Sequence, residues 1–256
     1  TLAGGIKTAL QESLGPFGRL AGFLVEALRL CAALAAALGA ARTLVAIGLV
    51  NREMLNDTYI DPVKDFFTRY GLKPALLLLL LIGFYRVSDI VLGVISTVFY
   101  LDLGFSKTQI AAIVKTFGLL MTIAGGFLGG MLTVRFGVLK ILFLGGVLAA
   151  ATNILFMILA GAGPNLFMLK AVVAADNLAA GLASAAFVAF LSSLTSISFT
   201  AVQYAVFSSL MSLFPKLIGG YSGTIATSIG YSNFFMLTAL MGIPVLLLIW
   251  LVRDLK

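Results

Sequence analysis

The chain has 256 residues, of which 61% are hydrophobic and only 11% are charged, and its formal net charge is +7. So apolar a composition over this length excludes an ordinary soluble domain. The only cysteine is Cys31, and there is no histidine or nucleotide-binding P-loop sequence. These features exclude a disulfide framework, zinc and histidine-based catalytic sites and an ATP-driven motor. We therefore expect no enzyme activity and no cofactor.

The N-terminal region, residues 1–50, is the least clear part of the sequence. The chain begins at Thr1 and not at methionine, and its start lacks the pattern of a cleavable signal peptide. We therefore expect a fragment or a processed piece of a longer protein. Residues 30–50 are apolar enough to form an additional transmembrane helix, although Arg29 and Arg42 flank or interrupt them.

Residues 51–73 are more polar and are predicted to be a linker. The linker ends in an amphipathic stretch, Asp61–Tyr70, with the sequence DPVKDFFTRY. We interpret this stretch as a helix at the membrane interface.

Six apolar segments follow, each long enough to cross a bilayer as a helix. They are predicted at residues 74–101, 107–132, 138–160, 165–191, 198–221 and 231–252. β-Strands of a membrane barrel would alternate apolar and polar residues, and these segments do not. The fold class predicted for residues 74–252 is therefore an all-α polytopic membrane protein.

Lysine and arginine set the predicted orientation. The basic residues are scattered singly between the apolar segments, which fits the positive-inside rule better than binding to nucleic acid. Eight of them fall in the linker, the 135–140 loop and the C-terminal tail at 253–256: Arg52, Lys64, Arg69, Lys73, Arg135, Lys140, Arg253 and Lys256. The loops of the opposite side hold only Lys107 clearly. The linker and the tail are thus predicted to be cytoplasmic.

The second three spans echo the first three. The second span begins Ser106-Lys-Thr-Gln109 and the fifth begins Thr200-Ala-Val-Gln203, and both match a capping box. The first span of each triplet also carries an aspartate within the membrane, Asp89 and Asp176. This repetition predicts a 3+3 inverted repeat, the construction of each half of a major facilitator transporter.

Charged and polar residues inside the spans are costly in lipid and usually face a bundle interior or a watery cavity. Arg86 and Asp89 are three residues apart, so a helix places them on one face. Lys170, Asn177 and Ser184 repeat at seven residues on the fourth span. The candidate site residues are, for substrate, Tyr85, Arg86, Lys115, Asn177, Gln203 and Tyr204, and, for proton coupling, Asp89 and Asp176.

Two interpretations of these residues remain open. In the first, the candidate residues line a cavity whose net charge is positive, with contributions from Lys170 and Lys216. A positive cavity favours an anionic substrate, whose transport is coupled to a proton. Alternatively, Arg86 pairs with Asp89, or Asp176 with Lys115, and the pairs only lock the bundle. Buried ion pairs are weak sources of stability, which favours the first interpretation.

Small and aromatic residues mark packing and interface positions. GGFLGG at 125–130 contains two overlapping GxxxG patterns, which are typical of close helix packing. Aromatic residues near the span ends are predicted to form interfacial belts: Tyr100, Tyr221, Tyr231 and Trp250.

Three segments, taken in order and spacing, resemble the second half of AmpG-type muropeptide permeases. These segments are DPVKDFFTRYG, FYRVSDIVLGVISTVFYLDLGFSKTQIA and DNLAAGLASAAFVAFLSSLTSISFTAVQYAVFSSL, and the likeness runs from about residue 59 to 252. AmpG-type permeases belong to the major facilitator superfamily and are related to eukaryotic acetyl-CoA transporters. The resemblance implies proton-driven import of anhydro-muropeptides across the bacterial inner membrane for cell-wall recycling.

A full member of that family has two six-span halves, and this chain supplies one. An N-terminal six-helix half is therefore an expected partner, together with protons, an anionic small molecule and the lipid bilayer. Two other functions remain open: a carrier of another bulky anion, such as a CoA ester or a siderophore, and a non-transporting membrane scaffold or remnant.

Overall fold

The computed structural model describes residues 51–253, together with positions 25, 28–29, 31–33, 35–37, 39–40, 43–45 and 47. The chain divides into two compact units, Thr1–Asp61 and Pro62–Lys256. In the first unit, the described positions from 25 to 45 are helical, and α3 (Arg52–Leu55) and the π-helix η2 (Asn56–Ile60) follow. The additional span predicted at 30–50 lies only partly within the described residues. Of the predicted tail at 253–256, only Arg253 is described.

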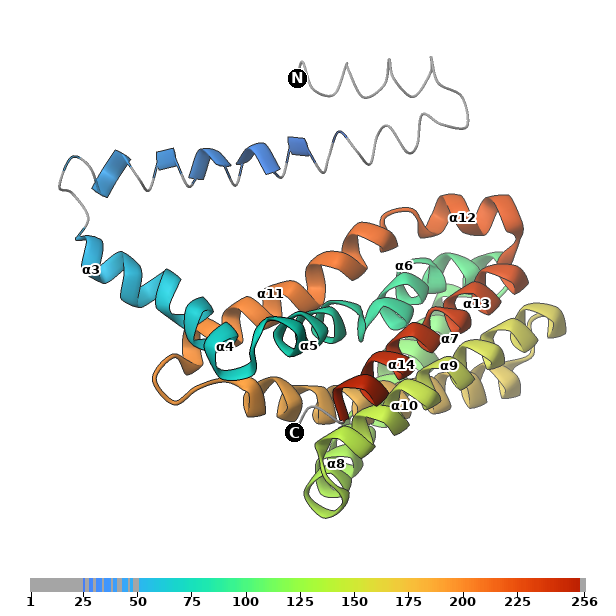
Figure 1. Ribbon diagram of the computed structural model, residues 1–256. Coiled ribbons are helices and arrows are strands. Elements are labelled where there is room, and N and C mark those ends of the chain that lie inside the picture. Colours follow the sequence, from blue (N-terminus) through green and yellow to red (C-terminus); the bar gives the residue numbers. More distant parts are fainter. Residues whose placement is uncertain are drawn as a thin grey trace. The chain divides into compact units, whose positions relative to one another are not determined.

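Six helical segments in the described part of the chain are long and apolar enough to cross a membrane (Figure 1). They are Leu72–Asp102, Lys107–Phe136, Val138–Ala162, Leu166–Leu194, Thr200–Ile229 and Tyr231–Arg253. All six predicted segments are thus confirmed. The described residues contain no strand, so the predicted fold class, an all-α polytopic six-helix half of a major facilitator-like fold, is confirmed too.

Several of these spans are built from more than one helix. The second unit contains, in order, α4 (Asp61–Tyr70), α5 (Leu72–Phe84), α6 (Val87–Asp102), α7 (Lys107–Ile110), η3 (Ala111–Phe117), α8 (Gly118–Phe136), α9 (Val138–Ala162), α10 (Leu166–Leu194), α11 (Thr200–Gly219), α12 (Ser222–Ile229), α13 (Tyr231–Leu240) and α14 (Gly242–Arg253). The first span is interrupted at Tyr85 and Arg86, where Arg86 leaves the helical region with φ −96° and ψ 8°. The sequence predicts a continuous span here, so the interruption corrects that prediction.

The contacts between spans follow the predicted inverted repeat. The second span packs along the fourth through α8 and α10, and the fifth packs along the first through α11, α5 and α6. Exchanging the two triplets converts one of these pairings into the other. The third and sixth spans, which the exchange also relates, contact each other through α9, α13 and α14.

Two apolar clusters form the core, one toward each end of the spans. The cluster nearer α4 includes Phe66, Leu78, Phe187, Leu191 and Val252. The cluster nearer α7 includes Val91, Phe99, Phe156, Leu169 and Phe234. The first span passes from one cluster to the other between Tyr85 and Val87. Arg86 and its neighbours Ser88 and Asp89 therefore lie near the middle depth, between two apolar layers.

Glycines allow the second and fourth spans to approach closely. A Cβ atom on Gly125 would lie 2.2 Å from the carbonyl oxygen of Leu178, and one on Gly129 would lie 2.6 Å from that of Leu182. The packing interpretation is thus confirmed for the pattern of Gly125 and Gly129, but not for that of Gly126 and Gly130, where a Cβ would meet an atom at 3.9 Å or nothing within 4 Å. The linker helix α4 also joins the core, because Phe66 is buried against Phe207 with ring centroids 5.2 Å apart.

Of three local predictions, one is confirmed and two are corrected. Ser106 and Gln109 form the predicted capping box, with bonds of 2.9 and 3.2 Å. The second predicted box is wrong, because α11 is capped at Phe199 and the Gln203 side chain bonds elsewhere. The belt prediction is wrong for Tyr100, which is buried against Phe99 and Phe156.

We expect Gly125→Ala to lower the free energy of unfolding by about 1–3 kcal/mol, because the new methyl group must push α8 away from α10. Gly130→Ala on the same helix is the control, since a Cβ there meets nothing within 4 Å and alanine is the better helix former. Thermal unfolding in detergent, followed by circular dichroism, measures both. Equal unfolding temperatures for the two variants would contradict the packing described here.

Candidate functional site

Arg86 and Asp89 form an ion pair in the first span. Arg86 Nε lies 3.4 Å from Asp89 Oδ2, and the two side chains are 23% and 19% exposed. Arg86 Nη1 also donates a hydrogen bond of 2.6 Å to Ser184 Oγ on α10. Among the described residues, the buried Nε finds no hydrogen-bond partner. The arginine thus joins the first span to the fourth, and its Nε has an ion-pair partner in Asp89 but no hydrogen bond.

The fourth span places Asp176 and Asn177 beside different neighbours. Thr152 Oγ1 donates to Asp176 Oδ1 at 3.2 Å, and Thr122 Oγ1 donates to Asn177 Oδ1 at 2.9 Å. Asp176 also lies within electrostatic range of Asp89 and Arg86. Arg86 and Asp89 of the first span and Asp176 of the fourth therefore lie near one another in the bundle interior, at middle depth.

Lys115 is placed apart from these acids. It is exposed on the π-helix η3, and the pairing with Asp176 that the sequence left open is absent from the ion pairs of the described residues. The other open pairing, Arg86 with Asp89, is present. π-Helical turns within longer helices are frequent at functional sites, so the position of Lys115 keeps it of interest.

The two candidate tyrosines pack into the linker-end core. The Tyr85 hydroxyl donates to the carbonyl oxygen of Leu142 at 3.0 Å, and its ring stacks on Phe187 with centroids 4.5 Å apart. Tyr204 is half-buried against the same core cluster. Tyr85 is therefore adjacent to Arg86 in sequence, but its polar atom is already bonded to α9.

A buried chain of hydrogen bonds, which the sequence does not predict, joins three of the spans. Asn153 Nδ2 donates to Ser88 Oγ at 2.6 Å, and Ser88 Oγ donates to the carbonyl oxygen of Thr238 at 2.7 Å. All three residues are at most 4% exposed, and they join the first, third and sixth spans. Asn153 could have indicated this chain from the sequence, because an amide inside an apolar span requires a hydrogen-bond partner.

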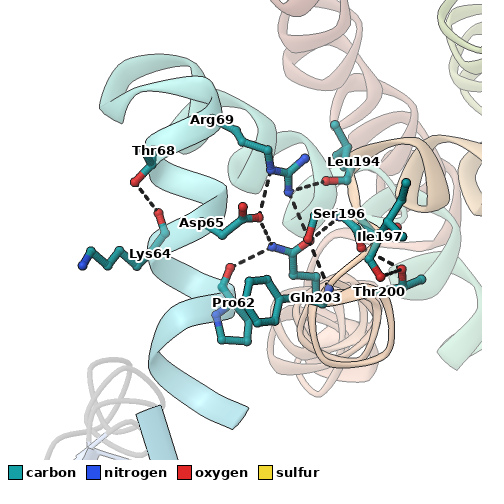
Figure 2. A network of polar contacts seen from close by, with 12 residues as sticks. Pro62, Lys64, Asp65, Thr68, Arg69, Leu194, Ser196, Ile197, Thr200 and Gln203 are labelled. Atoms are coloured by element: carbon teal, nitrogen blue, oxygen red, sulfur yellow. Dashed lines mark hydrogen bonds and ion pairs between the residues drawn. The ribbon is translucent and has the colours of Figure 1, made fainter. Parts of the chain in front are cut away.

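Gln203 lies in a separate cluster at the linker end (Figure 2). Its Nε2 donates to the carbonyl oxygen of Pro62 at 2.8 Å and to Asp65 Oδ2 at 2.9 Å. Its Oε1 accepts from the backbone N–H of Ser196 at 2.7 Å and from Arg69 Nη2 at 3.1 Å. Both amide donors and both acceptor positions are thus used. Ser184 and Leu194 lie ten residues apart on α10, so this cluster is about 15 Å along the helix from Arg86.

Arg69 completes the attachment of α4 to the connection between the fourth and fifth spans. It bonds Asp65 Oδ2 through Nε at 2.9 Å and the carbonyl oxygen of Leu194 through Nη2 at 3.1 Å. Partial burial alone would raise the pKa of Asp65. The hydrogen bonds from Gln203 and Arg69, with the charge of Arg69, outweigh burial and hold that pKa below its usual range.

Two cavities accompany these elements. One of about 430 Å³ lies between α8, α9 and α10 and has Thr152 in its otherwise largely apolar wall. The other, of about 540 Å³, lies on the linker side, where α8 and α14 end and α9 begins. Neither is lined by Arg86, Asp89 or Asp176. These charged residues therefore meet between helices and not in either cavity.

Comparisons with known proteins give no matching family model. Three curated relatives are a putative transporter AmpG 4 of Rickettsia conorii (33% identical, 75% of this chain, 46% of the relative), the anhydromuropeptide permease of Escherichia coli K12 (32%, 78%, 40%) and an uncharacterized protein of Haemophilus influenzae (35%, 76%, 48%). The chain spans less than half the length of these relatives. The names of the first two are those of a transporter and a permease, in agreement with the prediction that the chain is not an enzyme.

The lowered pKa of Asp65 predicts how stability depends on pH. The charged cluster contributes above about pH 4, where even an unfolded aspartate is ionised, and the contribution is lost as the pH falls through the lowered pKa. Asp65→Asn should therefore cost about 1 kcal/mol at pH 6 and less at pH 3. Unfolding in detergent at both pH values measures this, with exposed Asp57→Asn as the control. A cost that is equal at the two pH values would contradict the assignment.

Proposed function

Over about three quarters of its length the chain is homologous to AmpG-type permeases, and on this premise we propose that it forms one six-helix half of a secondary transporter. The proposed setting is the bacterial inner membrane, with the linker on the cytoplasmic side. Six apolar helices with an inverted-repeat contact pattern support the proposal. In such folds the substrate binds between two halves near the bilayer midplane, so a second six-helix half is the proposed partner.

The proposed substrate is an anhydro-muropeptide, an anionic sugar–peptide. The printed name of the Escherichia coli relative suggests this class. Arg86 supports it, because a guanidinium binds a carboxylate well and its buried Nε has no hydrogen-bond partner within the described chain. We assign the first anion contact to Arg86, and second contacts to Lys115, Tyr204 and Asn177, whose Nδ2 has a second hydrogen beyond the one bonded to the Val173 carbonyl.

Gln203 and Tyr85 have a different proposed role. Their polar atoms are already bonded to neighbouring helices, so binding substrate through them requires breaking those bonds. We therefore assign them to holding the helices that surround the substrate and not to direct contact.

Proton coupling is proposed for Asp89 and Asp176. Both lie in the first span of a triplet, and both are within electrostatic range of Arg86. Protonation of Asp89 removes the partner of Arg86, and an anion can then replace that partner. Substrate and proton would bind together by this exchange, which is what symport requires.

Uptake by the gene product that contains this chain tests the proposal. We expect proteoliposomes with an imposed inward proton gradient to accumulate labelled anhydro-muropeptide above its external concentration. A labelled CoA ester and a siderophore are the comparison substrates. Uptake of the CoA ester alone would overturn the substrate, and no uptake of any of these would favour a scaffold.

Asp89→Asn in the same protein separates coupling from binding. We expect gradient-driven accumulation to fall to background, while exchange of labelled for unlabelled substrate at equal concentrations continues, because exchange needs no net proton movement. Asp57→Asn, at an exposed position in η2, is the control and should leave both activities unchanged. Normal accumulation by Asp89→Asn would remove Asp89 from the coupling role.

A further inference from the structure

The cavity at the linker-side end of the bundle has a lining that the proposed transport function does not use. It measures about 540 Å³ and lies where the second span ends, the third begins and the sixth ends. Its walls are Phe136, Val138, Leu139, Phe143, Ile249 and Trp250, with Gly137 and two basic residues, Lys140 and Arg253, at the same place. Large apolar side chains and positive charge therefore share one hollow at the level where the membrane helices end.

The apolar wall of this cavity is open to its surroundings. Phe136, Phe143 and Trp250 are 48%, 42% and 53% exposed. In a membrane-spanning bundle, exposed aromatic residues near helix ends contact lipid at the boundary of acyl chains and headgroups. The hollow can thus accept a flexible hydrocarbon chain along its side.

Its polar end favours an anion. Lys140 and Arg253 are exposed and line the cavity, and the guanidinium of Arg135 stacks on Phe136 at 5.4 Å. Among the described residues, the lining contains no carboxylate. The cavity therefore combines an apolar wall with an electropositive rim.

The first turn of α9 adds backbone donors at the same end. Gly137 is the N-cap, with φ +91°, and it has no side chain with which to cap the helix. The first N–H groups of a helix have no partner within it, and they carry the positive end of the helix dipole. Phosphate oxygens suit such N–H groups, particularly beside lysine and arginine.

We propose that this cavity is a binding site for an anionic phospholipid, with the headgroup phosphate at the first turn of α9 between Lys140 and Arg253. One acyl chain lies against Phe143 and Trp250. A neutral lipid brings no net negative charge to the basic rim, and a soluble anion leaves the aromatic wall exposed. Basic hollows between membrane helices on the cytoplasmic side are suited to such headgroups. The proposal does not depend on which substrate the protein carries.

Trp250 gives a direct readout, because it is the only tryptophan of the chain. The purified protein is placed in nanodiscs of phosphatidylcholine that contain increasing amounts of phosphatidylglycerol, brominated near the ester end of its acyl chains. We expect quenching of Trp250 to be half-maximal at a mole fraction on the order of tenfold lower than with brominated phosphatidylcholine. Equal quenching by the two lipids would overturn the proposal.

Lys140→Gln combined with Arg253→Gln should remove this preference. Lys107→Gln combined with Lys170→Gln is the matched control, because it removes the same charge from exposed lysines at the opposite ends of the spans. The control should keep the preference, and its equal loss in both double variants would indicate general surface attraction and overturn the site. Lys140→Gln alone, checked by thermal unfolding, guards against misfolding and should lose part of the preference.

A soluble competitor distinguishes lipid from free phosphate. Inorganic phosphate at millimolar concentration should leave quenching by brominated phosphatidylglycerol unchanged, because it has no chain for the aromatic wall. Displacement of the lipid by inorganic phosphate would make the cavity a soluble-anion site and overturn the lipid assignment.

Discussion

A charged side chain at membrane depth must find its partner inside the protein, and much of this structure follows from that constraint. Arg86 meets Asp89 beside it and Ser184 across the bundle. These groups lie between an apolar cluster at each end of the spans. The two clusters exclude water above and below, so the polar middle depends on contacts between helices.

Those contacts need helices that approach closely. Gly125 and Gly129 bring α8 against the backbone of α10 at Leu178 and Leu182. The same approach sets the register in which Thr122 reaches Asn177. The small residues and the polar residues thus belong to one arrangement: close packing places short hydroxyl side chains within reach of the amide and carboxylate groups that lipid cannot satisfy.

The sequence was a good guide wherever a single segment determines the result. Hydropathy located all six spans, because crossing a bilayer is a property of each segment alone, and the Ser106 capping box is local as well. Thr200 to Gln203 has the same pattern, but Gln203 bonds to α4 and to the 194–196 turn instead. The part of that alternative formed by α4 comes from residues more than 130 positions away, which no local pattern reveals. The interruption at Arg86 and the chain from Asn153 to Thr238 depend on tertiary contacts in the same way.

The degree to which polar atoms are satisfied separates structural clusters from the candidate site. The Gln203 amide uses both donors and accepts two hydrogen bonds, all from its own chain, so any ligand there must break existing bonds. Arg86 is different: its Nε is buried near a carboxylate yet lacks a hydrogen-bond partner in the described residues. A buried donor without a partner costs about 1–3 kcal/mol. An anion that supplies a better-placed acceptor than Asp89 would recover part of this energy on binding, and for this reason we propose the incomplete cluster, and not the complete one, as the place for a substrate.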